Sequence, residues 1–400
     1  MNNNKSLLLK ISVIMNTVLA FFGSYIGNLY IIQIIALIPA FLAVPLKEIK
    51  IKKDTEMWLI VVVIFFLSAV ISNNKIASVE IVCMIAMAVM LKIIYENSDI
   101  KLSKFFINFV EMASCIHVIA TIMQLINPGF IQNINTSILG SAGIKTNLEL
   151  LKVGSYAGIT AQTAVNAYYI TIFICIKFSK ILTEKRYKVI NVMWLLVAII
   201  ALFLTGKRGM VICIIISSSI LYLYKMRSNY KKIVKNIVIA LIFIAFFYII
   251  IINVPEAKVL IDKTSQLEKN NDILNGRSYL WSETIKIFKC YPIMGIGIGS
   301  IKDILGDYSH NVYIQLLAET GIIGFLSYAI AITTSLLMSI KKLKNALKGK
   351  NKMVMEILGF SILMQIIFII YSITGNPLYG HIFLIPYIIS TAMHNQKNIE

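Results

Sequence analysis

Charged residues are scarce in this sequence, and acidic ones are the scarcest. Only 14% of the 400 residues are charged, and 19 acidic residues stand against 38 basic ones. Soluble domains average about a quarter charged residues, so this chain does not have the composition of one. Hydrophobic residues make up 58% of the chain instead, and the mean hydropathy is +0.80.

Metal and nucleotide motifs are also missing. Four of the five cysteines fall in apolar stretches, and only Cys290 lies in a polar segment. We find no CxxC, HExxH or DxD-type cluster in the segments expected outside, and no Walker loop. The alternating glycines of "GIGIGS" (295–300) follow no strand, so they indicate a flexible turn near a membrane surface rather than a nucleotide loop. We therefore expect no metal and no cofactor.

Long apolar runs recur along the whole chain. Each is long enough to cross roughly 30 Å of hydrocarbon as a helix. The sequence predicts an all-α, polytopic integral membrane protein with about twelve transmembrane helices. The predicted spans lie near 7–27, 29–46, 57–72, 76–94, 105–126, 158–176, 187–205, 209–224, 236–253, 311–339, 353–373 and 378–393.

The net charge of +19 could suggest a nucleic-acid partner. Positive charge in a membrane protein more often marks cytoplasmic loops. With the N-terminus inside, most Lys and Arg residues fall in the predicted inside loops and the two tails. We therefore expect a multi-pass protein of the cytoplasmic membrane with both termini cytoplasmic, in contact with the bilayer and with no nucleic acid.

The chain is predicted to form a single membrane domain over residues 1–400. Two extracytoplasmic segments are long enough to carry function. The first covers 127–157. The second, larger loop covers 254–310, between the ninth and tenth predicted helices, and contains the motifs described next.

Residues 277–290 of the larger loop have the pattern of an amphipathic helix. Trp281, Ile285 and Phe288 recur at helical spacing on one face, which suits a helix lying flat on the outer leaflet. Arg277 stands one turn before Trp281. On local grounds, interfacial anchoring by Trp and Arg explains this pattern as well as a functional role does.

The segment "LTGKRGM" (204–210) is a tight turn between two predicted spans. Lys207 and Arg208 then lie in a short outside loop, where the positive-inside rule disfavours them. A planar guanidinium pairs with phosphate oxygens, and flanking glycines allow close approach of a ligand. A snorkelling pair at a helix end is the alternative.

His310 stands just before the tenth predicted span, in "GDYSHNVYIQLLAETGIIGF" (306–325). Asp307 or Ser309 is the expected N-cap of that helix. The positive helix end disfavours a protonated imidazole, so His310 is expected to be neutral and able to act as a general base. On local evidence alone, a structural histidine is an equal alternative.

A polar stripe continues down the same predicted helix. Asn311, Gln315 and Glu319 recur at intervals of four residues. Polar and ionisable groups in a membrane helix are costly and usually face an interior or a partner, so the stripe is expected to orient a site.

Together these segments resemble the signature of the O-antigen ligase and polysaccharide polymerase family. That pattern has an Arg followed by an aromatic, a "P-x-x-G-x-G" turn and "HN-x-x-x-x-x-x-x-E-x-G-x-x-G". The matching residues, in order and spacing, are Arg277, Trp281, "YPIMGIGIGS", His310, Asn311, Glu319, Gly321 and Gly324. "LTGKRG" resembles an earlier "S/G-x-R-G" turn of the family, with Arg208 on the arginine. "YAGITAQTAVNAYYI" (156–170) matches more loosely.

The resemblance implies a metal-independent, inverting glycosyltransferase of the membrane-embedded C type (GT-C-like). Its donor is a glycan on a polyprenyl (undecaprenyl) pyrophosphate, transferred to an acceptor hydroxyl. Arg208, Arg277 and Lys207 would bind the pyrophosphate, and His310 would be the base. Lys152 and Tyr156 are weaker site candidates.

The motifs do not identify the acceptor molecule. A polymerase uses a second lipid-linked repeat unit and makes capsule, exopolysaccharide or O-antigen, with a flippase and a chain-length regulator as partners. A ligase uses a lipopolysaccharide core or a protein. A transporter or flippase is a third alternative, with Glu319 and the basic loops along a substrate path.

Overall fold

The computed structural model describes residues 3–22, 29–44, 49–183, 189–226 and 277–397. The predicted span at 236–253 and most of the loop at 254–310 lie outside these residues. No helix or strand other than α-helices, short 3₁₀ turns and one isolated β-bridge is found in the described ranges, which agrees with the all-α prediction.

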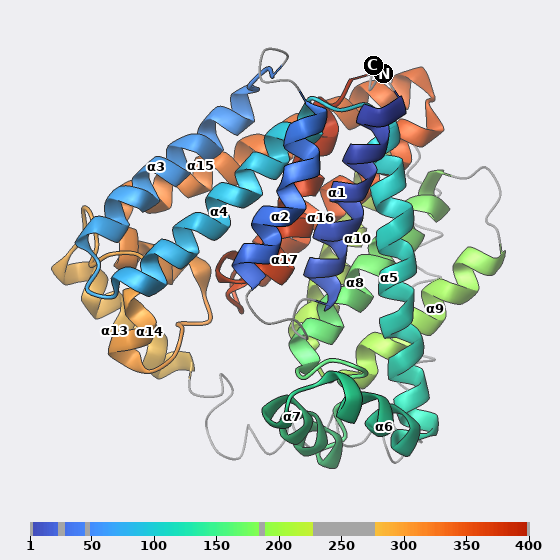
Figure 1. Ribbon diagram of the computed structural model, residues 1–400, viewed down its shortest axis with the longest axis horizontal. Coiled ribbons are helices and arrows are strands. Elements are labelled where there is room, and N and C mark those ends of the chain that lie inside the picture. Colours follow the sequence, from blue (N-terminus) through green and yellow to red (C-terminus); the bar gives the residue numbers. More distant parts are fainter. Residues whose placement is uncertain (1–2, 23–28, 45–48, 184–188, 227–276, 398–400) are drawn as a thin grey trace.

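The helices form a bundle whose members run between two opposite ends (Figure 1). Their bounds in chain order are α1 Asn3–Phe22, α2 Leu29–Ala43, α3 Lys53–Ile71, α4 Lys75–Glu96, α5 Ile100–Ile126, α6 Pro128–Ile138, α7 Ser141–Lys152, α8 Thr163–Thr183, α9 Val189–Leu204, α10 Arg208–Met226, α13 Arg277–Cys290, α14 Ser300–Leu305, α15 Val312–Gly349, α16 Lys352–Tyr371, η3 Pro377–Tyr379, α17 His381–Ala392 and η4 Met393–Asn395.

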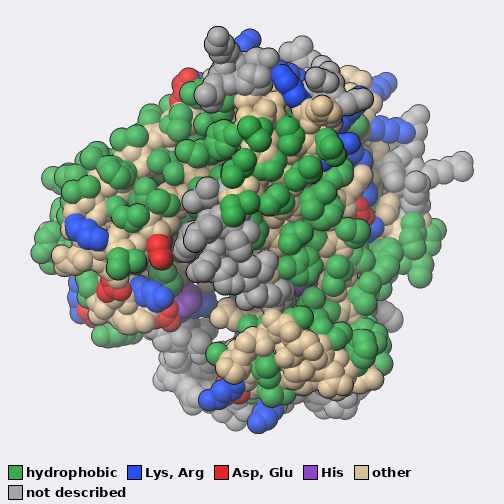
Figure 2. All heavy atoms as spheres, in the orientation of Figure 1, with side chains coloured by type: hydrophobic (Ala, Val, Ile, Leu, Met, Phe, Trp, Pro, Cys, Tyr) green, Lys and Arg blue, Asp and Glu red, His purple; other side chains and the backbone are tan. Residues whose placement is uncertain are grey.

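Among the described residues, eight helices are long and apolar enough to cross a membrane. They are α1, α3, α4, α5, α8, α10, α15 and α16. Helices α2, α9 and α17 are shorter, with 15, 16 and 12 residues. The chain is therefore a multi-pass membrane protein, while the expected total of twelve spans stays a prediction. Hydrophobic side chains cover most of the visible face, and Lys and Arg gather mainly toward its upper and lower edges (Figure 2).

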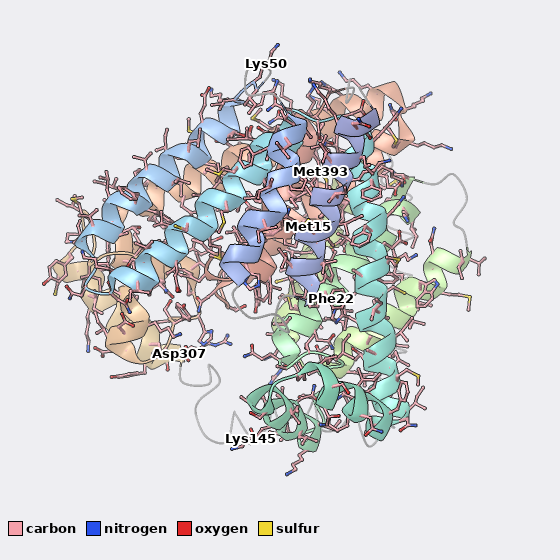
Figure 3. All side chains as sticks on the ribbon, in the orientation of Figure 1. Met15, Phe22, Lys50, Lys145, Asp307 and Met393 are labelled. Carbon is pink, nitrogen blue, oxygen red and sulfur yellow. The ribbon has the colours of Figure 1, made fainter. Side chains whose placement is uncertain are left out.

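The two ends of the bundle differ in what they hold. Lys50 lies at one end, where α1 begins, and Lys145 and Asp307 lie at the other (Figure 3). We call these the terminal end and the motif end. This separation agrees with the sequence-based grouping of inside and outside loops, although the direction of the bundle in a membrane stays a prediction.

The predicted loop at 127–157 is largely helical. Asn127 caps α6 through a bond from the Phe130 N–H (3.1 Å) to its side-chain oxygen, and Pro128 takes the first helical position. Asn147 of α7 is fully buried, and its amide donates to the Thr160 carbonyl (2.7 Å). The segment is therefore a helical cap bonded to the chain that follows it.

A buried ionic cluster lies at the terminal end, which the sequence analysis did not anticipate. Lys92 Nζ lies 2.7 Å from Asp54 Oδ2 and 2.7 Å from Glu96 Oε1, and all three side chains are fully buried. Asn395 from the C-terminal segment donates to both carboxylates at 2.8 Å. His394 Nε2 lies 3.4 Å from Asp54 Oδ2. Such pairs persist in low dielectric only when further hydrogen bonds satisfy them, as they do here.

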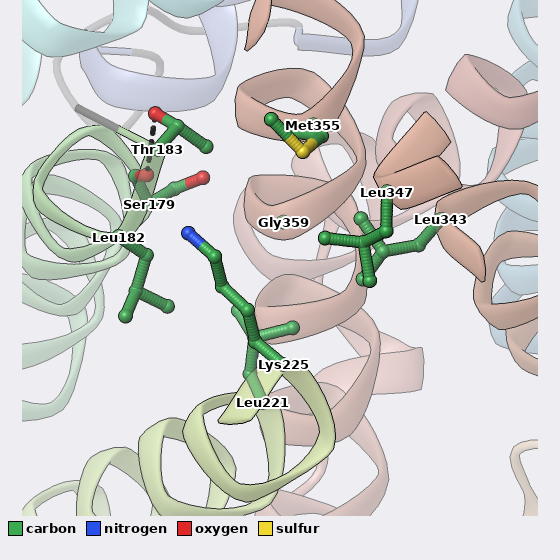
Figure 4. Close-up of a pocket in the computed structure, with 9 residues that line it drawn as sticks. All are labelled: Ser179, Leu182, Thr183, Leu221, Lys225, Leu343, Leu347, Met355 and Gly359. Carbon is green, nitrogen blue, oxygen red and sulfur yellow. Dashed lines mark hydrogen bonds between the residues drawn. The ribbon is translucent and has the colours of Figure 1, made fainter. Parts of the chain in front are cut away.

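A small hollow lies between helices at the terminal end. Figure 4 shows a hollow between α8, α10, α15 and α16, lined by Lys225 and Gly359 among others. Its volume is only about 10 Å³, which is room for about one water molecule. A Cβ on Gly359 of α16 would lie 2.6 Å from the Oγ of Ser179 on α8, so α8 and α16 meet closely there.

Candidate glycan-transfer site

The helix α15 is broken near its start, and the glycine-rich turn fills the break. Gly321 has φ 63° and ψ −169°, so the helical hydrogen bonds stop there. The Ile296 N–H donates to the Ala318 carbonyl (3.0 Å), and the Gly297 N–H donates to the Glu319 carbonyl (2.8 Å). Non-helical backbone in a membrane protein must be satisfied by such partners.

The other side of the break is satisfied by the same turn. The Ile322 N–H donates to the Pro292 carbonyl at 2.9 Å. A Cβ on Gly295, whose φ is +69°, would lie 2.6 Å from the Ala318 carbonyl oxygen, and a Cβ on Gly321 would overlap the Ile293 carbonyl. The motif glycines therefore allow backbone to meet backbone. The turn that the sequence suggested to be flexible is held on both sides.

The first segment of α15 runs along the motif end rather than across the bundle. At its start, the Val312 N–H donates to the carbonyl of Ser372, the residue after α16 (2.8 Å). Near its end, the Glu319 carbonyl accepts from Ser68, in the last turn of α3 (3.2 Å). Because both contacts are at the ends of neighbouring helices, the segment lies along the rim and the break at Gly321 turns α15 into the bundle.

Glu319 is fully buried and joins three parts of this region. Its Oε2 accepts from Tyr379 Oη at 2.6 Å. Its Oε1 accepts from Gln315 Nε2 (3.1 Å) and from the Ile301 N–H of α14 (3.2 Å). With every oxygen committed to a protein donor, Glu319 is placed to hold structure rather than to meet a substrate.

Gln315 extends this network to the residue before His310. Its Oε1 accepts from both the N–H and the hydroxyl of Ser309, each at 3.2 Å. Gln315 and Ser309 are fully buried. The expected polar stripe thus faces the protein interior, and it fixes the backbone on the N-terminal side of His310.

Asn311 is the N-cap of α15. Its side-chain oxygen accepts from the N–H groups of Tyr313 (3.0 Å) and Ile314 (3.2 Å). The expected caps, Asp307 and Ser309, were therefore wrong. Ser309 instead donates its hydroxyl to the Asn311 carbonyl at 2.9 Å. An aspartate or serine two or more residues before the N-cap cannot cap the helix, because only the residue next to the first turn reaches its free N–H groups.

His310 lies between these two buried residues in an unusual backbone conformation. Its φ is 53°, in the left-handed region that few non-glycine residues adopt. The side chain is 37% exposed, and its Nε2 lies 3.5 Å from Asp307 Oδ2. Strained backbone of this kind persists where the surroundings fix it, and it is frequent at functional sites.

Helix α13 packs against α15 and brings Arg277 to the same end. Trp281 Nε1 donates to the Ser309 carbonyl at 2.8 Å. The fully buried residue of α13 is Thr284, whereas Ile285 is 39% exposed. The helix therefore packs its Thr284 side against the protein, and its placement on the outer leaflet stays a prediction. On its outer side, Glu283 raises the pKa of Lys286 through a 2.7 Å ion pair.

Arg208 is the first residue of α10, and Gly206 before it has φ 68°. A hollow of about 140 Å³ lies beside this turn and is lined by Phe203, Gly206, Lys207, Arg208, Val211 and Ile212. The Tyr156 N–H donates to the Leu204 carbonyl at 3.0 Å, which places Tyr156 next to the turn. Lys152 is exposed at the end of α7.

The segment 371–381, from the end of α16 to the start of α17, contacts the Arg208 turn and the start of α15. A Cβ on Gly209 would lie 3.4 Å from Thr374 Oγ1. Helix α13 reaches the same region through Trp281, which bonds to the Ser309 carbonyl. The Val312 N–H reaches the Ser372 carbonyl, as described above. Helices α10, α15 and α17 thus all begin around one segment, and their partial positive ends favour an anion there.

The structure thus gathers the Arg208 turn, Arg277 and the His310 segment at one end, with Lys207 and Tyr156 beside Arg208. No described contact links Lys152 to segment 371–381. Sequence reasoning missed Tyr379, which holds Glu319. The sequence "NPLYGH" (376–381) around it carries a local signal, because Pro and Gly mark turns. Within the described ranges, no three His, Cys, Asp or Glu side chains are placed to hold a metal ion.

Comparisons with known proteins agree with the motif assignment. A family model described as O-antigen ligase matches residues 193–329. The exopolysaccharide production protein ExoQ of Rhizobium meliloti (strain 1021) is 26% identical over 99 residues, which cover 20% of this chain and 23% of that protein. The chain therefore aligns with about a quarter of this curated relative's length. The resemblance predicted from the motifs is confirmed: over residues 193–329, this chain is similar to the O-antigen ligase family.

Proposed function

We propose that the protein is a polysaccharide polymerase of the cytoplasmic membrane. It joins oligosaccharide repeat units carried on polyprenyl pyrophosphate, at the outer face, to make capsule, exopolysaccharide or O-antigen. The observation that carries this proposal is the gathering of the Arg208 turn, helix α13 with Arg277, and the His310 segment at the motif end, where α10, α15 and α17 begin. In this orientation the motif end faces outward and both termini are cytoplasmic.

The proposed reaction is a single displacement. The acceptor hydroxyl oxygen attacks the anomeric carbon while His310 takes the hydroxyl proton. The bond from that carbon to the pyrophosphate oxygen breaks, and polyprenyl pyrophosphate leaves. The configuration at the anomeric carbon of the transferred sugar is inverted. Arg208 and Arg277, with Lys207 nearby, stabilise the negative charge on the departing pyrophosphate without a metal. Fixed donors stabilise such a charge more strongly in a site that excludes water. Asn311, Gln315 and Glu319 position His310.

Ligation to a lipopolysaccharide core or a protein is the second candidate. The matching family, O-antigen ligase, favours it, whereas the name of the relative favours exopolysaccharide production. Both reactions use the same donor, so the acceptor decides between them. Transport is the third alternative, and it requires a substrate to cross the bilayer.

The test uses the purified protein in liposomes without an ion gradient, supplied with the lipid-linked repeat unit. A ladder of polymer lengths supports polymerisation. Transfer of single or multiple repeats only when a core acceptor is added identifies a ligase. Movement of the lipid-linked repeat between leaflets without any new glycosidic bond would overturn both and identify a transporter.

A further inference from the structure

Two polar atoms in the turn before α17 are buried without a hydrogen-bond partner. They are Oδ1 of Asn376 and Nε2 of His381. Both residues remain partly exposed, so the two atoms lie just inside the surface rather than deep in the bundle. Buried polar atoms are nearly always paired, and an unpaired one costs free energy, so these two atoms are candidates for contact with a polar ligand.

The turn that carries these atoms is fixed by other contacts. The Tyr379 N–H donates to the Asn376 carbonyl at 3.1 Å, and Tyr379 Oη donates to Glu319. Pro377 and Leu378 are buried. The turn is therefore held by the same carboxylate that positions Gln315 and, through it, Ser309. The turn therefore holds its two unpaired atoms in place. They have no protein hydrogen bond to break when a ligand binds.

Aromatic rings lie next to the same turn. The rings of Tyr308 and Tyr379 have centroids 5.5 Å apart, and Lys302 Nζ lies 5.2 Å from the Tyr308 ring centroid. Tyr308 is two residues before His310. The turn and the segment that carries the proposed base are thus in direct contact.

The chemistry of the two atoms selects the ligand. An amide oxygen only accepts, and a neutral imidazole nitrogen donates or accepts according to its tautomer. A phosphate oxygen would meet the Asn376 oxygen as acceptor against acceptor. A hydroxyl group can pair with either atom because it both donates and accepts, and ligand sites commonly combine a few such polar groups with aromatic walls.

We propose that Asn376 and His381 form a sugar-binding subsite that takes hydroxyl groups of the glycan beside the transfer site. This inference rests on the proposed function and adds a separate element to it: the arginines hold the pyrophosphate, and the 376–381 turn holds the sugar. A buried water would use the same chemistry, so the test must separate the two sources.

The test compares the affinity of the detergent-purified full chain for two lipids. One is polyprenyl pyrophosphate without sugar, and the other is the lipid-linked repeat extracted from cells that lack this protein. Asn376→Leu and His381→Phe should each bind the sugar-bearing lipid about tenfold more weakly and bind the sugar-free lipid as the wild type does. Asn376→Ala and His381→Ala repeat the measurement if the larger side chains prevent folding.

His117→Phe is the matched control. Both ring nitrogens of His117 also lack partners, but this ring is packed against Phe22 and Tyr169 in the bundle, with centroids 5.7 and 4.3 Å away. Its replacement should leave both affinities unchanged.

Three results would contradict the inference. Unchanged affinity for both lipids in all four variants would show that the two atoms hold water only. An equal loss for both lipids would make the turn a structural element. If the wild type binds neither lipid, the proposed function itself fails, which is a different outcome from failure of the subsite alone.

Discussion

The indole N–H of Trp281 donates a 2.8 Å hydrogen bond to the carbonyl of Ser309. This bond joins α13, which begins with Arg277, to the residue immediately before His310. Arg277, which is proposed to bind the leaving pyrophosphate, and His310, the proposed base, are therefore linked through one side chain. Removing that link can displace both residues.

Trp281→Phe keeps an aromatic ring but removes the donor. We expect about tenfold lower polymer formation, corresponding to one hydrogen bond of about 1 kcal/mol and some loss of orientation. Protein level and melting temperature should change little, because Trp281 is only half-buried. Normal polymer from Trp281→Phe would mean that the bond does not position His310.

Gly321→Ala tests the break in α15. A Cβ there would overlap the Ile293 carbonyl, and the backbone at φ 63° and ψ −169° lies in a region adopted essentially by glycine alone, which costs other residues about 1–3 kcal/mol. We expect a clear drop in melting temperature and in purified yield. Gly349→Ala is the matched control, since a Cβ at Gly349 meets nothing within 4 Å. Equal stability of the two variants would contradict the fixed turn.

Arg208→Lys keeps the positive charge but loses the paired fork. If Arg208 holds the pyrophosphate, polymerisation should fall by roughly 100- to 1000-fold, the typical cost of one charge-stabilising donor, at normal protein levels. The same applies to Arg277. Lys289→Ala removes an exposed positive charge at the far end of α13 and should leave activity intact. Full activity of Arg208→Ala would reduce that residue to a membrane anchor.

His310→Gln should fold, insert and bind the donor, yet lose polymer formation by about 100-fold or more, because it removes the base. Cells should accumulate single repeat units. His310→Asn is a second variant suited to the φ of 53°, since asparagine tolerates the left-handed region. Polymer of normal length from both variants would place the base elsewhere or show that none is needed.

Asn311→Ala should reduce activity less than these, as expected for an orienting residue. Loss of the cap should also destabilise the protein by about 0.5–2 kcal/mol. Asn311→Ser, which can still cap, separates the two effects. It should restore the melting temperature and most of the activity.

Thiol labelling in intact cells tests the orientation. Exposed Cys290 should react with a membrane-impermeant reagent, as should Lys145→Cys in a Cys290→Ser background. Asn345→Cys, which is exposed at the terminal end, should react only after lysis. Labelling in the reverse order would put the motif end in the cytoplasm.

The membrane helices were the most predictable part of the fold. The predicted end of one span at 126 and start of another at 209 agree with α5 ending at Ile126 and α10 beginning at Arg208. Both boundaries follow from a local signal, because a long apolar run stops at a polar residue or a glycine turn. Helix α6 also carried a local signal, in Asn127 followed by Pro128, which was overlooked within an apparently irregular loop.

The contacts inside the site could not be predicted in this way. Pro292 and Ile322 are thirty residues apart in the sequence, and only the break at Gly321 frees the N–H that joins them. Tyr379 follows Glu319 by sixty residues. The motif identified which residues matter, whereas the partners that satisfy their backbone and side chains depend on how the helices pack.

The ionic cluster at the terminal end has a consequence for how the protein is made. Lys92, Asp54 and Glu96 lie on α3 and α4, whereas Asn395, which donates to both acids, follows Glu96 by 299 residues. The two carboxylates therefore share one lysine until residue 395 has been synthesised. A ribosome that stalls before that codon leaves both hydrogen bonds from Asn395 to these buried acids unmade.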